Sequence, residues 1–173
     1  MPITRFLDEG YAVTAWFMNP NIHPLSEYLR RREAVILACE NLGVPIRFAD
    51  ETWDITAWLR SVHPIDTPPK RCHFCCGSRI EAAVLYAVQN GFTAVSSSLL
   101  YSIYQPHDFI AQEGAAQAAK AGISFLYRDF RKDWQAGIDM SKAMGLYRQP
   151  YCGCIYSEAD RYHKKLQRLV KTA

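Results

Sequence analysis

Four short apolar segments alternate with longer segments of helical periodicity, and this alternation limits the possible folds more than any other feature of the 173-residue chain. The short segments are residues 11–18, 44–48, 92–97 and 123–127, and their aromatic and β-branched residues are typical of β-strands. Strands that alternate with helices usually form a parallel sheet covered by helices. We therefore predict an α/β fold with a largely parallel sheet.

The longer segments are predicted to be helices because their apolar residues recur at helical spacing. They are a short helix at residues 2–9 and longer ones at residues 26–42 (with Ser26 as N-cap), 52–62, 80–90 and 108–121. With 49% apolar and 21% charged residues, the length fits one packed domain over residues 1–173. A βα unit normally starts with its strand, whereas this chain starts with a helix fragment, so we expect an N-terminal strand of the fold to be missing.

Loops that follow predicted strands should gather at one rim of the sheet, where ligands bind in open α/β folds. These loops are residues 19–24, 96–106 and 129–134. The first contains His23, which is either a hydrogen-bonding residue or a ligand or catalyst. The third contains Asp129 beside Arg131 and Asp133, which form either a solvated charge cluster or part of a site.

The chain has six cysteines and no recognisable secretion signal or membrane span. We therefore expect a cytoplasmic protein with reduced thiols and no membrane partner. In that setting metal binding or redox chemistry is a better interpretation of the cysteines than a disulfide framework. The sequence lacks the motifs G-x-x-x-x-G-K-[ST], G-x-G-x-x-G and H-E-x-x-H, which argues against a nucleotide hydrolase, a nicotinamide enzyme and a zincin. A net charge of +3 permits a polyanionic partner without requiring one.

Cys72 and Cys75 form a C-x-x-C motif that is predicted to lie immediately before a helix. Unpaired N–H groups and the helix dipole at that position would stabilise thiolates, which bind metals or attack disulfides. A tetrahedral metal site takes four ligands, so a bound metal would need further ligands from elsewhere. The alternative is a pair of buried or idle thiols. Cys76 is either a third ligand or a small core residue.

Cys152 and Cys154 form a C-x-C motif in a loop, and Gly153 between them leaves room for the two sulfurs to approach each other. Such a motif suits an easily reduced disulfide or a metal clip. Together with the C-x-x-C motif it favours a joint redox or metal function. Cys39 falls in an apolar helix register and is predicted to be a core residue.

Aromatic and basic residues surround the C-x-C motif. Tyr147, Arg148 and Tyr151 are of the types that stack on unpaired bases and contact phosphates. The basic residues of the C-terminal segment are Arg161, His163, Lys164, Lys165, Arg168 and Lys171. This last segment is either a solubilising helix face or a contact to nucleic acid.

Five segments carry a resemblance to one family: YAVTAWFMNPNIHP (residues 11–24), RCHFC (71–75), SSSLLYSIYQPH (96–107), FLYRDFRKDW (125–134) and GLYRQPYCGC (145–154). In order and approximate spacing they resemble the motifs of the QueH-type epoxyqueuosine reductases. The resemblance implies a Rossmann-like, mostly parallel sheet with helices on both faces, related to the adenine-nucleotide α-hydrolases. It also implies the activity, which is reduction of epoxyqueuosine to queuosine at the wobble position of tRNA.

The same resemblance implies roles for the cysteines. In the family the C-x-x-C motif, here Cys72 and Cys75, supplies two ligands of a [4Fe–4S] cluster. The late C-x-C motif, here Cys152 and Cys154, is a redox-active pair. The cofactors to expect are therefore the cluster and, as a further candidate, an additional iron ion.

Removing the epoxide oxygen requires two electrons and a Lewis acid or proton donor for the departing oxygen. We expect Asp129 or His23 to deliver the proton. The expected partners are tRNA carrying epoxyqueuosine and an unidentified electron donor.

This chain departs from the family at its start. Family members open with a strand and an H-x-C-C-x-P-C loop that supplies the other two cluster ligands, and this sequence begins after that loop. We therefore expect it to close a normal cluster only if Cys76 or an outside ligand substitutes. Two rival interpretations are a metal-stabilised RNA-binding module without catalysis and an inactive fragment of the reductase.

Overall fold

The computed structural model describes residues 1–172, and these alternate between strands and helices as predicted. The helices are α1 (Pro2–Asp8), α2 (Leu25–Leu42), α3 (Ile55–Val62), α4 (Lys70–Gln89), α5 (His107–Lys120), α6 (Trp134–Ala143) and α7 (Ile155–Thr172). The strands are β1 (Ala15–Phe17), β2 (Ile46–Phe48), β3 (Ala94–Val95) and β4 (Ser124–Phe125). All four strands fall inside the segments predicted for them. Helix α6 is one that the sequence patterns do not predict.

The strands pair in parallel, but they form two small sheets rather than one. In the first sheet β1 pairs with β2, with Ala15 opposite Ile46 and Phe17 opposite Phe48. In the second, β3 pairs with β4, with Val95 opposite Phe125. The expected parallel pairing is confirmed, whereas the expected single sheet is not formed, since within residues 1–172 no strand ladder joins the two pairs.

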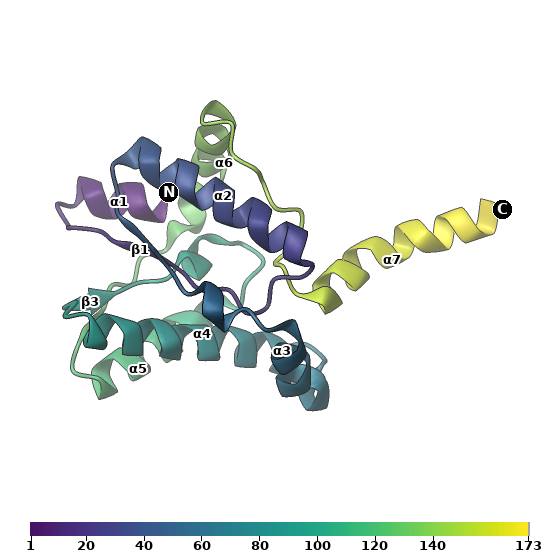
Figure 1. Cartoon of the computed structure of the whole chain (residues 1–173), viewed down its shortest axis with the longest axis horizontal. Coiled ribbons are helices and arrows are strands. Elements are labelled where there is room, and N and C mark those ends of the chain that lie inside the picture. The colour runs from purple at the N-terminus through teal and green to yellow at the C-terminus, as the bar shows by residue number, and fades with distance from the viewer. Residues whose placement is uncertain (173) are drawn as a thin grey trace.

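Strand β1 lies between α2 and α4 (Figure 1). Its alternating side chains pack on both helices. Phe17 packs against Tyr28 of α2 with ring centroids 5.3 Å apart. On the opposite face Trp16 stacks on Tyr86 of α4 at 4.5 Å and 12° between the ring planes. Because successive side chains of a strand point to opposite faces, this three-residue strand fixes α2 and α4 relative to each other.

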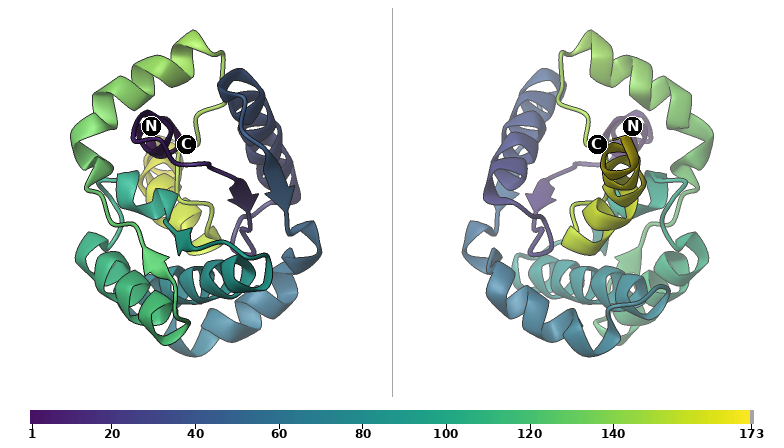
Figure 2. Two further views of the ribbon diagram at one scale, coloured as in Figure 1. Left: turned by 90° about the vertical axis from the view of Figure 1, so that its left-hand side faces the viewer. Right: turned by 90° about the vertical axis from the view of Figure 1, so that its right-hand side faces the viewer.

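The larger core lies between α4, α5 and the β3–β4 pair. These elements lie together at one side of the molecule (Figure 2). Its fully buried members include Ile80 of α4 and Ile110 of α5. Helix α5 approaches β4 so closely that a Cβ at Gly114 would lie 2.3 Å from the ring of Phe125. This core holds the beginning of α4 and α5 side by side, and the C-x-x-C motif lies at that end of α4.

The predicted start of two helices differs from the observed start. Ser26 is not the N-cap of α2, because the helix already begins at Leu25 after Pro24, and no side chain caps it. Helix α3 begins at Ile55 rather than residue 52, since the Asp54 carboxylate accepts hydrogen bonds from the main-chain N–H groups of Thr56 and Ala57.

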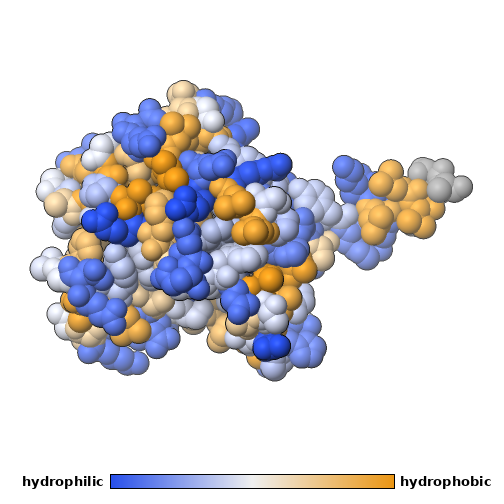
Figure 3. Space-filling view, in the orientation of Figure 1, coloured by the Kyte–Doolittle hydropathy of each residue, from blue (hydrophilic) through white to orange (hydrophobic). Residues whose placement is uncertain are grey.

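Helix α7 projects from the body of the molecule and carries the C-terminus at its far end (Figure 1). It exposes apolar side chains next to polar ones (Figure 3), with Leu166 and Leu169 each 59% exposed and Val170 70% exposed. The basic residues predicted on this segment are on the helix, although the side chains of Lys164 and Lys171 lie outside the described residues. Within residues 1–172, no helix is both long and apolar enough to span a membrane.

Candidate active site

The C-x-x-C motif lies in the first two turns of α4, not ahead of the helix as predicted. Pro69 occupies the N-cap position and the main-chain N–H of Arg71 donates to Thr67, so the helix forms before the motif is reached. Cys72 and Cys75 are therefore three residues apart on one helix face, and both are half-buried.

Cys76 points into the core. It is 2% exposed, belongs to the cluster between α4 and α5, and its thiol donates to the Gln105 Oε1 atom at 3.6 Å. This environment favours the interpretation of Cys76 as a small core residue.

The C-x-C motif lies in the loop between α6 and α7, and its two thiols face different surroundings. Cys152 is exposed, whereas Cys154 is only 5% exposed. The main-chain N–H groups of Tyr156 and Ser157 donate to the Cys154 thiol, and the N–H of Glu158 donates to the Cys154 carbonyl at 3.0 Å. Cys154 therefore occupies the start of α7 and satisfies N–H groups that a helix leaves free in its first turn.

The two motifs lie close enough to influence each other's protonation. The pKa of the Cys75 thiol is raised to about 12 and that of Cys76 to about 11; burial is the largest cause, and Cys152 acts in the same direction. Burial also raises the pKa of Cys72, and Cys152 acts in the same direction. These pKa values are raised rather than lowered as predicted from the helix start, and burial is the largest cause.

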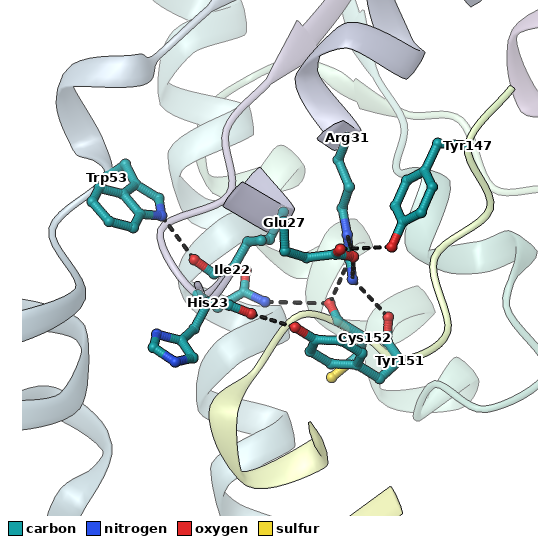
Figure 4. A network of polar contacts seen from close by, with 9 residues as sticks. Ile22, His23, Glu27, Arg31, Trp53, Tyr147, Tyr151 and Cys152 are labelled. Atoms are coloured by element: carbon teal, nitrogen blue, oxygen red, sulfur yellow. Dashed lines mark hydrogen bonds and ion pairs between the residues drawn. The ribbon is translucent and has the colours of Figure 1, made fainter. Parts of the chain in front are cut away.

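A buried ion pair on α2 holds the C-x-C loop (Figure 4). The Arg31 guanidinium donates from Nη2 to the Tyr151 carbonyl at 2.9 Å and from Nη1 to the Cys152 carbonyl at 3.1 Å. Its Nε donates to Glu27 at 2.8 Å, and both side chains are less than 10% exposed. Since buried charges require partners, the pair and the two carbonyls form one satisfied unit.

Tyrosines on either side of the motif complete this unit. The Tyr147 hydroxyl donates to Glu27 at 2.6 Å. The Tyr151 hydroxyl donates to the main-chain carbonyl of His23, and the Arg31 guanidinium lies 5.4 Å from the centre of the Tyr151 ring. Tyr147 and Tyr151, predicted as base-stacking residues, are thus both engaged with α2 or the loop before it.

The loop at residues 19–24 lies directly against the C-x-C motif. The His23 N–H donates to the Gly153 carbonyl at 2.8 Å, and the Asn21 amide donates to the Cys152 carbonyl at 3.5 Å. His23 contacts the motif through its main chain, while its imidazole points away from Arg31 (Figure 4). The same loop reaches α4, where Arg79 donates to the Asn19 side chain at 2.6 Å.

Comparison with known proteins matches this arrangement of motifs to a family. A family model described as "Epoxyqueuosine reductase QueH" matches residues 1–160. The chain belongs to the QueH family. Proteins named epoxyqueuosine reductase QueH are similar to it: that of Dehalococcoides mccartyi is 32% identical, over 91% of this chain and 85% of the relative. The Thermotoga maritima protein is 35% identical over 86% and 81%, and the Acinetobacter baylyi protein 36% over 89% and 72%.

The QueH resemblance implies a [4Fe–4S] cluster, and the positions of the cysteines test whether the described residues could hold one. Cys72 and Cys75 offer thiols of the kind that hold iron–sulfur clusters. However, in residues 1–172 no group of three or more His, Cys, Asp or Glu side chains is placed to hold a metal ion. A [4Fe–4S] cluster takes four such ligands, so the described residues do not by themselves fit one.

Asp129 is the predicted site residue that the structure does not join to the cysteines. Its carboxylate accepts two hydrogen bonds from the Arg131 guanidinium, at 2.8 and 2.7 Å, and lies 4.0 Å from His107. Arg131 holds the pKa of the Asp129 carboxyl below its usual range. Among the described residues no hydrogen bond or ion pair links Asp129 to a cysteine. A carboxyl with a lowered pKa is a poor proton donor at neutral pH.

The sequence patterns missed several buried polar residues, among them Glu27, Arg31 and His107. Glu27 and Arg31 are spaced four residues apart on α2, a spacing that predicts an ion pair but not its burial. His107 is 6% exposed at the start of α5; its Nε2 lies 3.2 Å from the Tyr127 hydroxyl, and its Nδ1 has no hydrogen-bond partner within residues 1–172. The Q-P-H sequence after a predicted strand was the available signal for His107.

Proposed function

We propose that this chain reduces epoxyqueuosine to queuosine at the wobble position of tRNA. Membership of the QueH family supports the activity. The observation that carries it is that the segments bearing the two cysteine pairs meet although they lie far apart in the sequence: Arg71, next to Cys72, lies 3.5 Å from Asp160 and 4.7 Å from the centre of the Tyr156 ring, both in the helix that follows Cys154. Structural thiols have no reason to converge in this way, whereas a shared redox site requires it.

The C-x-C pair is proposed as the immediate electron source. Removing the epoxide oxygen takes two electrons and two protons and yields an alkene and water. Oxidation of the Cys152 and Cys154 thiols to a disulfide releases two electrons and two protons, so one turnover balances with one dithiol. An electron donor, not yet identified, must then reduce the disulfide for the next turnover.

The exposures of the two thiols suggest a division of roles. Cys152, which is exposed, is proposed to be the thiol that reaches the modified base, and Cys154, which is buried, is proposed to be the thiol with which it forms the disulfide. His23, whose main chain lies next to the motif, is proposed to pass one of these two protons from the thiols to the departing oxygen. Asp129, which has a lowered pKa and contacts His107, is proposed to orient the His107 imidazole.

The proposed cofactor is a [4Fe–4S] cluster for which Cys72 and Cys75 supply two ligands, and an additional iron ion is a further candidate. Such a cluster transfers electrons one at a time. The other ligands would have to come from elsewhere, because the described residues contain no group of three or more metal-ligating side chains. The two-electron step is therefore assigned to the thiols alone.

The finer fold is also a proposal. On one side β1 pairs with β2, and on the other β3 pairs with β4, all in parallel. This is the arrangement on the two sides of the middle of a doubly wound sheet, which supports a Rossmann-like fold of the adenine-nucleotide α-hydrolase type.

The test measures queuosine formed in tRNA that carries epoxyqueuosine, under anaerobic conditions with iron, sulfide and a chemical reductant. We expect turnover by the parent protein and its loss in Cys152→Ser and Cys154→Ser. Cys39→Ala, at a buried cysteine in α2, is the matched control and should retain activity. Binding of metal and tRNA without queuosine formation would instead support a metal-stabilised RNA-binding module.

A further inference from the structure

Three consecutive carbonyls of the C-x-C loop are all fixed from one side. The carbonyls of Tyr151 and Cys152 accept from Arg31, and the carbonyl of Gly153 accepts from the His23 main chain. A loop without secondary structure normally leaves such groups to water. Here the orientation of each peptide plane across the motif is set by α2 and the loop that precedes it.

This orientation matches the dithiol form of the motif. Cys152 and Cys154 are free thiols, one exposed and the other 5% exposed, so they face different environments. A disulfide requires the sulfurs to meet at about 2.05 Å. Across a single intervening residue, that movement must rotate the peptide planes of the loop and turn carbonyls away from Arg31.

We propose that Arg31 is a positioning residue that stabilises the dithiol form of the Cys152–Cys154 pair and thereby makes the pair a stronger oxidant when it is a disulfide. The guanidinium suits this role because its fork can donate to two carbonyls at once. Glu27 is 2.8 Å away and buried with it, and Tyr147 holds the far oxygen of Glu27, so the fork has a fixed direction. A role of Arg31 in turnover rests on the proposed function, whereas its effect on the thiol–disulfide equilibrium does not.

The test measures the thiol–disulfide equilibrium of the pair against reduced and oxidised dithiothreitol, without tRNA. Two thiols lose two electrons and two protons to oxidised dithiothreitol, which becomes the dithiol. After trapping with iodoacetamide, trypsin releases residues 149–161, whose only cysteines are Cys152 and Cys154, and residues 72–79, which contain Cys72, Cys75 and Cys76. Mass spectrometry then gives the oxidised fraction of each peptide separately.

Arg31→Lys keeps the charge but cannot donate to both carbonyls in the same geometry. We expect its equilibrium to shift toward the disulfide by about tenfold, the factor that corresponds to about 1.4 kcal/mol. Arg32→Lys is the matched control, because Arg32 is adjacent on α2 and pairs with Asp50 at the surface, and its equilibrium should equal that of the parent. An unchanged equilibrium in Arg31→Lys, or a shift toward the dithiol, overturns the proposal.

Glu27→Gln provides a second variant in case Arg31→Lys does not fold. It leaves the fork in place but removes the charge that orients it, and we expect a shift of about threefold toward the disulfide. No shift in folded Glu27→Gln would then overturn the proposal. Because the readout needs no substrate, a protein that fails to form queuosine but shows both shifts would contradict the proposed function and leave the role of Arg31 standing.

Discussion

The two cysteine motifs are held in place by opposite means. The C-x-x-C motif lies on a 20-residue helix whose own hydrogen bonds fix its backbone and whose buried face packs on α5. The C-x-C motif has no regular structure, and one buried arginine supplies two of the hydrogen bonds that fix it. The first position is therefore secured by many small contributions, and the second by a few strong ones.

This difference has a physical consequence for substitutions. Apolar packing is distributed, so each residue contributes a modest share and losses are partial. The stabilisation by a buried charge depends on one residue, because removing that residue takes a hydrogen bond from each of its acceptors at once. We expect the C-x-C side of the site to tolerate far less change than the C-x-x-C side.

The largest effect is expected for Arg31→Ala. The substitution removes the cation that pairs with the buried Glu27 carboxylate and takes one donor from each of two carbonyls, which should lower the free energy of unfolding by about 3–5 kcal/mol. Urea unfolding followed by circular dichroism measures it. Arg32→Ala, which breaks a surface pair, should cost less than about 1 kcal/mol. Equal losses in the two variants would show that the buried pair does not carry the loop.

A smaller loss is expected for Gly153→Ala. Gly153 has φ of +106°, and a Cβ there would lie 2.8 Å from Ile22 and 3.1 Å from the Arg31 guanidinium. Strain and contact together should cost about 1–3 kcal/mol in urea unfolding. The control is Gly145→Ala, where φ is +66° but no atom lies within 4 Å of the added Cβ. If the two variants lose the same stability, the contacts with Ile22 and Arg31 contribute nothing.

On the C-x-x-C side we expect Ile80→Val to cost only about 0.5–1.5 kcal/mol, because one methyl group is lost from a large cluster. Ile80 is 2% exposed and lies one turn beyond Cys76. The same urea measurement applies, with Val88→Ala at a 45% exposed position of α4 as the control. A loss as large as that of Arg31→Ala would remove the contrast between the two motifs.

The smallest effect is a change in pH dependence. Burial, together with the charges of Glu158 and Glu27, raises the pKa of Tyr151 to about 12. An unfolded tyrosine titrates near pH 10, so between about pH 10 and 12 the unfolded state loses this proton first. Stability from the neutral phenol is therefore complete below about pH 10 and declines as the pH rises through that window.

Tyr151→Phe should lose this decline, so its free energy of unfolding, measured in urea from about pH 9 to 11.5, should approach that of the parent as the pH rises. Tyr104→Phe, at an 81% exposed position, controls for the loss of a tyrosine in general. Parallel curves for the parent and Tyr151→Phe would contradict the assignment.

The sequence predicts those features of the molecule that depend on neighbouring residues. The strand segments, the helix of residues 108–121 and the burial of Cys39, which is 1% exposed, follow from local composition and periodicity. The role of Arg31 does not, because its carbonyl partners lie 120 and 121 residues further along the chain. The start of α4 at Lys70 was missed for a local reason, because the turn before it contains prolines, which normally indicate a loop.

The place of Cys154 at the beginning of α7 has a mechanical consequence. The N–H groups of the first turn of this helix bond to the sulfur and carbonyl of one cysteine, so the direction of the helix depends on how that residue is held. Helix α7 has 18 residues and projects from the body (Figure 1). With a rise of about 1.5 Å per residue it is a lever about 27 Å long, and a tilt of about 10° at its base displaces its tip by about 5 Å. A change in bonding at a single sulfur atom is thereby magnified into a movement as large as a side chain.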